Sequence, residues 1–160
     1  CADLTIMAED AQIGYMPARV WGCPTTAMWV YRLGAERAKR MLFTGDKISG
    51  REAADMGLVL KAVPADQLED AVEEMAARMT SVPINQLAMQ KLVINQAIEQ
   101  TGLMQTQRMA TIFDGITRHS PEGLNFKARS EEMGWKRAVQ ERDEGTFDWT
   151  RNQVLPKGNR

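Results

Sequence analysis

The chain has 160 residues, of which 44% are hydrophobic, and a formal net charge of −1 at pH 7. This length and apolar content are sufficient for a single domain with a buried core. The 20 basic residues are scattered among 21 acidic ones. No basic face that could follow a phosphate backbone is therefore apparent, and nucleic acid is not an expected partner. No apolar run approaches the roughly 18–20 residues that cross a bilayer, so no membrane partner is expected either.

The cysteine and histidine content predicts neither a disulfide framework nor a metal site. Cys1 and Cys23 are the two cysteines, and reduced, buried thiols in a cytoplasmic protein are the simplest interpretation. His119 is the single histidine and has no cluster of ligating residues around it in the sequence. We therefore predict no metal.

The first 24 residues predict two short strands followed by an irregular loop. Leu4, Ile6 and Ala8 fall on one side of an extended segment, as is typical of a strand. Residues 11–15 predict a second strand, reached through an acidic turn. Residues 14–24 contain two prolines and two glycines, a composition that indicates a loop.

Residues 35–42 predict a basic helix that ends before a turn at residues 44–46. Its charged side chains are best interpreted as a solvated face, because a run of charges on a helix more often contacts water than binds an anion. The buried side of this helix is predicted to carry Ala38, Met41 and Leu42.

A short capped helix and a strand follow. Ser49 is predicted to cap a helix that begins at Gly50, with Glu52 completing a capping box. Gly57 stands where a helix commonly ends in a left-handed residue. The apolar residues 58–63 then predict a strand.

The remainder of the chain predicts helices. Apolar residues recur at helical spacing over residues 68–79 and again over a helix opened by Pro83, in which Lys91 is expected to make a structural pairing. Ser120 is predicted to cap a helix that carries apolar residues to Val139 and ends at residues 141–143 and Phe147, with a frayed tail at residues 154–160. Between these segments, residues 103–117 predict a helix whose apolar stripe consists of Leu103, Met104, Arg108, Thr111 and Ile112.

The order of residues 42–59, LFTGDKISGREAADMGLV, followed by Val63 and Pro64, resembles the enoyl-CoA hydratase/isomerase family, also called the crotonase family. Phe43 and Gly50 depart from that family's pattern. The resemblance covers at least residues 1–102, and residues 134–147 are similar to the family's closing signature. An altered stretch after Pro24 indicates a divergent branch.

The resemblance implies an α/β fold, the ββα spiral of ClpP/crotonase-like proteins. Residues 1–64 would form the C-terminal part of the spiral core, residues 65–150 a helical trimerisation and lid region, and residues 151–160 a tail. The N-terminal half of the same protein, which carries the oxyanion hole of the family, is expected upstream of this chain.

The resemblance also places a site in residues 14–24, which in the family line the acyl pocket and carry a catalytic Glu. Anchoring on Gly14 and Pro24 puts Pro17 at the Glu position, and a shift by one residue puts Ala18 there, so neither alignment provides a carboxylate. Tyr15 and Arg19 are the nearest replacement candidates, whereas Asp46 and Glu52 are better interpreted as turn and cap residues. Predicted substrate contacts are Met16, Trp21, Pro24, Trp135 and Lys136, with core packing as the alternative for Met16 and Trp21.

The activity implied by the resemblance is enoyl-CoA hydration in a cytoplasmic homotrimer or dimer of trimers. Coenzyme A would enter as the thioester substrate, and no cofactor is implied. Alternatives are an isomerase, hydrolase or decarboxylase of the same fold, and a paralogue that binds acyl-CoA without turnover. A free-standing helical interaction module is a further alternative.

Overall fold

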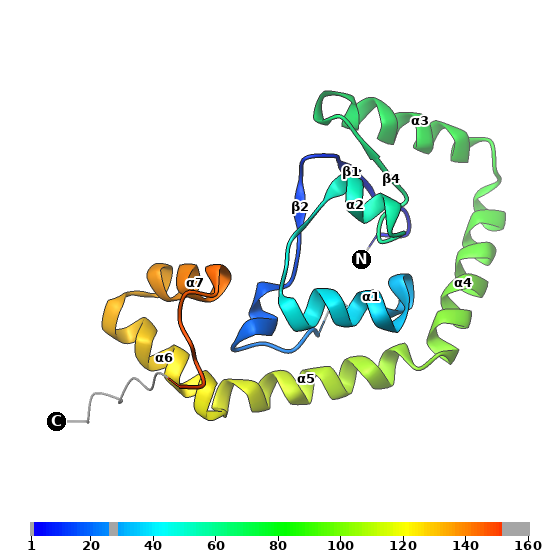
Figure 1. The fold of residues 1–160 in the computed structure, drawn as a ribbon. Coiled ribbons are helices and arrows are strands. Elements are labelled where there is room, and N and C mark those ends of the chain that lie inside the picture. The colour runs from blue at the N-terminus through cyan, green and yellow to red at the C-terminus, as the bar shows by residue number, and fades with distance from the viewer. Residues whose placement is uncertain (1, 26–28, 152–160) are drawn as a thin grey trace. The chain divides into compact units, whose positions relative to one another are not determined.

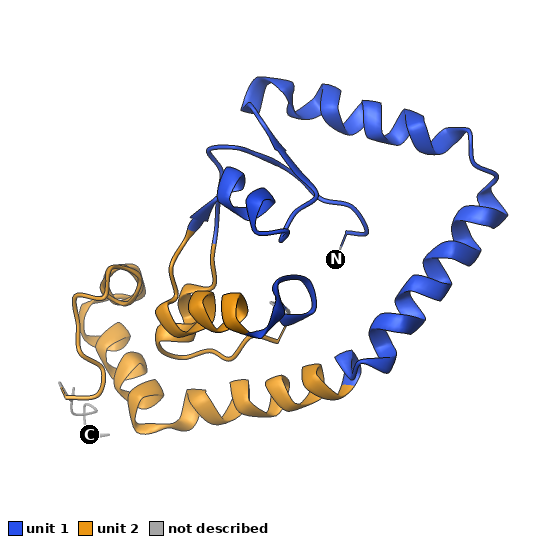
Figure 2. Cartoon of the chain, turned by 45° about the vertical axis from the view of Figure 1, so that its right-hand side comes forward, with its two compact units in different colours: residues 1–13, 29–35, 48–104 blue, residues 14–28, 36–47, 105–160 orange. Residues whose placement is uncertain are grey.

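The computed structural model describes residues 2–25 and 29–151, so Cys1 and the predicted tail at residues 154–160 lie outside the described residues. Short strands are followed by a long series of helices (Figure 1). The chain forms two compact units, which are coloured separately in Figure 2. Unit 1 contains residues 1–13, 29–35 and 48–104, and unit 2 contains residues 14–28, 36–47 and 105–160. The domain boundary predicted at residue 64 comes from the family pattern and does not correspond to these two units. It stays a prediction.

The strands of unit 1 form two pairs. Strand β1 (Ile6–Ala8) is parallel to β4 (Lys61–Val63), whereas β2 (Gln12–Ile13) is antiparallel to β3 (Ile48–Ser49). The predicted strand at residues 58–63 is therefore too long at its beginning, and the one at residues 11–15 is too long at both ends.

Hydrogen bonding explains why β4 begins at Lys61 and not at residue 58, where the sequence predicted its start. The amides of Leu58 and Val59 donate to the carbonyl of Ala53 at 2.8 and 3.3 Å, which closes the C-terminal end of the preceding helix. The amide of Leu60 then donates to Thr5 at 2.9 Å and leads into the strand pairing.

Helix α2 (Gly50–Asp55) confirms the predicted cap. The Ser49 hydroxyl accepts from the amide of Glu52 at 3.2 Å. Gly57 adopts φ +82°, the left-handed conformation predicted for it. Local sequence signals therefore determine both ends of this helix.

Helix α1 (Val30–Thr44) is interrupted at Gly34, whose φ of +74° and ψ of 172° are not helical. Its regular part starts at Ala35, as predicted from the sequence. Ala38 and Met41 are 4% and 1% exposed, which confirms the predicted buried side.

The next helices of unit 1 are η2 (Ala65–Gln67), α3 (Leu68–Thr80) and α4 (Ile84–Gln100). The helices agree with the predicted positions, but the apolar residues that recur along α4 are not buried in the described chain, since Leu92 remains 67% exposed. Lys91 makes the predicted structural pairing, with its Nζ 2.6 Å from Oδ2 of Asp3, although both side chains are exposed.

Unit 2 contains α6 (Pro121–Met133), α7 (Trp135–Glu144) and, from residue 105 on, α5 (Leu103–His119). The predicted stripe of α5 is wrong except for Leu103, because the other four residues of the stripe are exposed. Ala110 is buried, and the half-buried residues of the helix share its face, whereas Ile112 is 63% exposed. Apart from Leu103, the helix therefore packs with small and polar side chains. The half-buried residues of this face are Leu103, Thr106, Asp114 and Thr117.

The single helix predicted after Ser120 is divided into α6 and α7 at Gly134, where φ is +91°. The Ser120 cap is confirmed, because its hydroxyl accepts from the amide of Gly123 at 3.1 Å. The core of unit 2 includes Phe126, whose ring centroid lies 5.1 Å from that of Trp149. Its buried members are Val20, Phe126, Ala138 and Trp149.

A buried ion pair joins α6 to α7. Glu141 is 6% exposed, and its two carboxylate oxygens accept from Nε and Nη2 of Arg129, both at 3.0 Å. These hydrogen bonds lower the pKa of Glu141 despite its burial. Because a charge buried without a partner is costly, each member of the pair depends on the other.

Among the described residues, none of the helices combines the length and the apolar character that a bilayer crossing requires. The same residues contain no group of three or more side chains arranged to hold a metal ion.

Gly50 provides a stability test of unit 1. A Cβ at this position would lie 2.0 Å from the carbonyl oxygen of Ala8, so the substitution G50A forces the backbone to move. We expect a loss of about 1–3 kcal/mol in the free energy of unfolding, measured by denaturant titration. The control is G115A in α5, where a Cβ meets no atom within 4 Å and should stabilise by about 0.5–1 kcal/mol. Equal effects of the two substitutions would contradict the close approach at Gly50.

Candidate functional site

The segment predicted as the site folds as a compact turn. Residues Met16–Arg19 form the 3₁₀ helix η1, with Pro17 in one of its first two positions. Pro17 and Ala18 are half-buried, and neither side chain can transfer a proton. A Cβ on Gly22 would lie 2.7 Å from Cβ of Pro17, so the segment folds back closely on itself.

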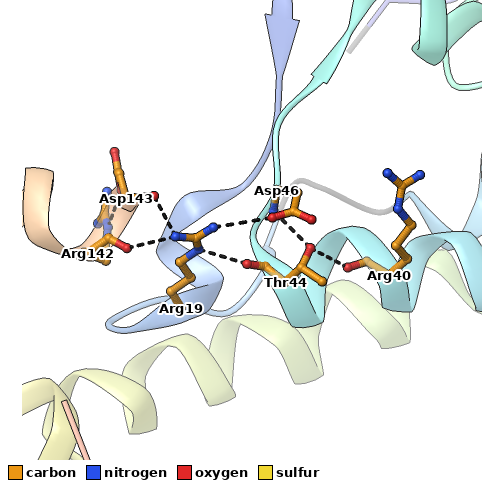
Figure 3. Close-up of polar contacts among 6 residues, drawn as sticks. All are labelled: Arg19, Arg40, Thr44, Asp46, Arg142 and Asp143. Carbon is orange, nitrogen blue, oxygen red and sulfur yellow. Dashed lines mark hydrogen bonds and ion pairs between the residues drawn. The ribbon is translucent and has the colours of Figure 1, made fainter. Parts of the chain in front are cut away.

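The guanidinium of Arg19 lies at the centre of a set of acceptors (Figure 3). Its Nε donates to the carbonyl of Thr44 at 2.9 Å, and its Nη1 donates to the carbonyl of Asp143 at 2.6 Å and to that of Arg142 at 3.4 Å. Nη2 lies 3.5 Å from Oδ1 of Asp46. Each of its three nitrogens thus has a protein acceptor, which favours a positioning role over direct catalysis.

The turn at residues 44–46 matches the prediction and supports the same set of contacts. The Thr44 hydroxyl donates to the carbonyl of Arg40 at 2.9 Å and accepts from the amide of Asp46 at 3.1 Å. Gly45 adopts φ +65° between them. Asp46 therefore acts as a turn residue, in agreement with its interpretation from the sequence.

Tyr15 is also directed into the segment. Its hydroxyl donates to the carbonyl of Cys23 at 3.0 Å. Burial raises the pKa of Tyr15, and the charge of Asp114 raises it further. The hydroxyl is therefore protonated at neutral pH, where it acts as a hydrogen-bond donor and not as a base.

Asp114 holds the far end of the segment and was missed by the sequence analysis. Its Oδ1 accepts from the amide of Cys23 at 3.0 Å, and its Oδ2 accepts from Nε and Nη2 of Arg118 at 3.0 and 2.9 Å. The hydrogen bond from Cys23 is the main cause that lowers the pKa of Asp114. Burial raises the pKa of the Cys23 thiol, which is half-buried and protonated at neutral pH. The i, i+4 spacing of Asp114 and Arg118 was the only signal in the sequence.

Trp21 has an unusual backbone conformation, with φ +74° in a bulky residue. Its ring centroid lies 5.1 Å from that of Phe126, and the guanidinium of Arg118 lies 5.2 Å from the Trp21 ring. The indole nitrogen is buried and has no acceptor among the residues that the structure describes. These contacts agree with core packing as readily as with the predicted substrate contact.

The other predicted substrate contacts differ in exposure. Met16 and Pro24 are half-buried in the segment. Trp135 is 65% exposed in the first turn of α7, with Nζ of Lys136 5.9 Å from its ring centroid. All four assignments stay predictions.

The chemistry available in residues 14–25 is limited to hydrogen bonding and packing. Tyr15 and Cys23 have raised pKa values, while Asp114 is held ionised by its partners. None of these groups is suited to exchange a proton near neutral pH. The described part of this segment can form one wall of a site and supply hydrogen-bond donors, but it does not supply an acid–base pair.

A model of the enoyl-CoA hydratase/isomerase family matches residues 1–136. The structure is similar to that of an enoyl-CoA hydratase from Mycobacterium smegmatis, with 47% identity, a TM-score of 0.85, and coverage of 90% of this chain and 49% of that chain. An enoyl-CoA hydratase/isomerase from Xanthobacter autotrophicus Py2 is 25% identical, with a TM-score of 0.80 and coverage of 92% of this chain and 55% of that one.

A Dictyostelium discoideum protein named "Probable enoyl-CoA hydratase, mitochondrial" is 28% identical over 139 residues, covering 83% of this chain and 50% of the relative. The chain thus spans about half the length of these three relatives.

The lowered pKa of Asp114 predicts a pH-dependent contribution to stability. A carboxyl whose pKa is lower in the folded state stabilises above its unfolded pKa of about 3.9, and this contribution is lost as pH falls through the folded pKa. We expect D114N to cost about 1–2 kcal/mol at pH 7, because the Arg118 contact loses its charge while the amide oxygen can still accept from Cys23.

Urea unfolding of the protein at pH 7 and at pH 3 measures this effect. The difference between wild type and D114N should shrink at the lower pH. As a control, D114N made in the E141Q background should show the same cost and the same decrease with pH, because Glu141 bonds to Arg129 and not to the partners of Asp114. A cost of D114N that stays constant with pH would contradict the assignment.

Proposed function

The chain belongs to the enoyl-CoA hydratase/isomerase family and has the fold of the C-terminal portion of a crotonase subunit, and on this basis we propose that it is part of an enzyme that acts on acyl-CoA thioesters. The proposed reaction is the addition of water to a 2-trans-enoyl-CoA. The family match over residues 1–136 is the observation that carries this proposal. The match argues against a free-standing helical module.

The proposed mechanism divides the work between this chain and the N-terminal half expected to precede it. Two backbone N–H groups of that half would hold the thioester oxygen and stabilise the charge that develops in an enolate-like transition state, an effect worth several kcal/mol. Residues 14–24 and the helices of this chain would contribute the wall of the acyl pocket. Coenzyme A is the carrier of the substrate in this proposal, and no further cofactor is required.

The missing carboxylate favours a second candidate function. Hydration needs groups that activate water and protonate carbon, and general acid–base catalysis contributes roughly 10²–10⁴-fold in rate. Pro17 and Ala18 provide no such group, and the nearby Tyr15 and Cys23 have raised pKa values. An isomerase, hydrolase or decarboxylase that uses another group, or an acyl-CoA-binding paralogue without turnover, follows from this observation.

A homotrimer or a dimer of trimers in the cytoplasm is the proposed assembly. Exposed apolar side chains support an association of this kind, since Leu92 of α4 and Ile112 of α5 are 67% and 63% exposed. Light scattering of the purified protein tests the proposal, which requires three or six times the subunit mass.

The reaction is tested with the chain expressed together with any sequence that precedes it in its natural gene. Incubation with a panel of acyl-CoA thioesters, followed by mass analysis of the products, distinguishes the candidates. A gain of the mass of water supports hydration, an unchanged mass with a shifted double bond supports isomerisation, and release of free coenzyme A supports hydrolysis. Calorimetric binding without any product would support the non-catalytic paralogue.

Restoring a carboxylate provides the sharpest prediction. If residue 17 holds the position of the acid, P17E should raise the hydration rate of crotonyl-CoA by about 10²-fold or more, while P17Q, with the same shape but no acid, should not. A18E and A18Q make the same comparison for the alternative alignment. If both glutamate variants remain at the wild-type rate, the proposed hydration site is wrong.

A further inference from the structure

The three carbonyls that accept from Arg19 belong to the ends of two helices. Thr44 is the last residue of α1, and Arg142 and Asp143 lie in the last turn of α7. The final carbonyls of a helix have no partner within it, and they carry the partial negative charge of the helix dipole. A single guanidinium therefore contacts the ends of two helices in unit 2, as Figure 3 shows, and the carbonyl of Arg142 also accepts from the amide of Gly145 at 3.2 Å.

Two glycines make room for this arrangement. Gly45 follows α1 and Gly145 follows α7, both in the left-handed conformation with φ +65° and +66°. A Cβ on Gly45 would lie 2.8 Å from Cγ and 2.9 Å from Nε of Arg19, and one on Gly145 would lie 3.3 Å from Nη1. Both helix ends thus lie so close to Arg19 that a residue larger than glycine at position 45 or 145 would displace the arginine side chain.

The turn that carries Arg19 has little stability of its own. It is a 3₁₀ helix of four residues without a side-chain cap, and 3₁₀ turns of this length are held by their surroundings. Arg19 anchors its C-terminal end, while Asp114 holds Cys23 further along. The position of Pro17 and Ala18 therefore depends on the contacts of Arg19.

We propose that Arg19 is a positioning residue that couples the segment 14–24 to the C-terminal ends of α1 and α7, so that these three segments keep one common conformation. Its role in turnover rests on the proposed function, whereas the coupling itself does not. Arginine is required because its fork reaches several acceptors at once, which the single ammonium of a lysine cannot do.

Hydrogen exchange of the whole protein tests the coupling. In R19A, exchange should rise about tenfold in residues 14–24, 40–47 and 135–145 together, because all three lose contacts to the same group. R19K keeps the charge and should restore at most one of the three segments. D46N removes only the charge from the exposed contact of Nη2, whose hydrogen bond the amide oxygen can still accept, and should leave exchange near wild type. A rise confined to one segment, or a uniform rise across unit 2, would overturn the proposal.

A steric test uses two left-handed glycines with different surroundings. G45A and G57A both place a Cβ on a left-handed residue, but Gly57 has no atom within 4 Å of that Cβ. We expect only G45A to reproduce the exchange pattern of R19A. In the R19A background, G45A should add no more than the effect of backbone strain that G57A shows, since the side chain that it would displace is already absent. A further rise in exchange larger than that caused by G57A would contradict the proposal.

Activity separates positioning from direct substrate contact. For the reaction identified with the acyl-CoA panel, R19A should lower kcat about tenfold or more while KM changes less than threefold, because the wall of the site loses its position. A large rise in KM with unchanged exchange would instead identify Arg19 as a substrate-binding residue. If no acyl-CoA is turned over, the proposed function fails, and the exchange experiments still decide whether Arg19 couples the segments.

Discussion

The requirement that polar main-chain groups be satisfied at helix ends determines how unit 2 is built. Arg19 meets the last carbonyls of α1 and α7, and Asp114 meets the amide of Cys23. Both contacts involve a charged group, which makes them stronger than hydrogen bonds between neutral partners. A segment with only one turn of regular structure is thereby held at two points, at Arg19 in its middle and at Cys23 near its end.

This construction bears on what the segment can do for a substrate. A wall that is held by charged contacts changes little when a ligand arrives, so it can discriminate by shape. The ionisable side chains that contact it, Arg19 and Asp114, are already engaged in protein contacts and are less available for chemistry. If Pro17 or Ala18 holds the position of the family's acid, as the resemblance implies, the chemistry would have to come from groups that other parts of the protein provide.

Local features were predicted well from the sequence, and long-range ones were not. The caps at Ser49 and Ser120 and the left-handed Gly57 depend on a few neighbouring residues, so the sequence contains their complete signal. The hydrogen bonds of Arg19 to Thr44 and Asp143 span 25 and 124 residues, and nothing in the local pattern indicates them. The family resemblance pointed to residues 14–24 as a candidate site, which stays a prediction, whereas the partners that hold this segment could be identified only in the structure.

The face of α5 that packs against the protein differs from the predicted one, and this has a practical consequence. Because Ala110 and Asp114 face the protein, the larger apolar side chains Met109 and Phe113 remain 52% and 48% exposed. Hydrophobic surface of this kind adheres to itself in concentrated solution unless another polypeptide covers it. If the 160 residues are produced alone, aggregation through this surface would therefore limit the yield more than the intrinsic stability of the helices.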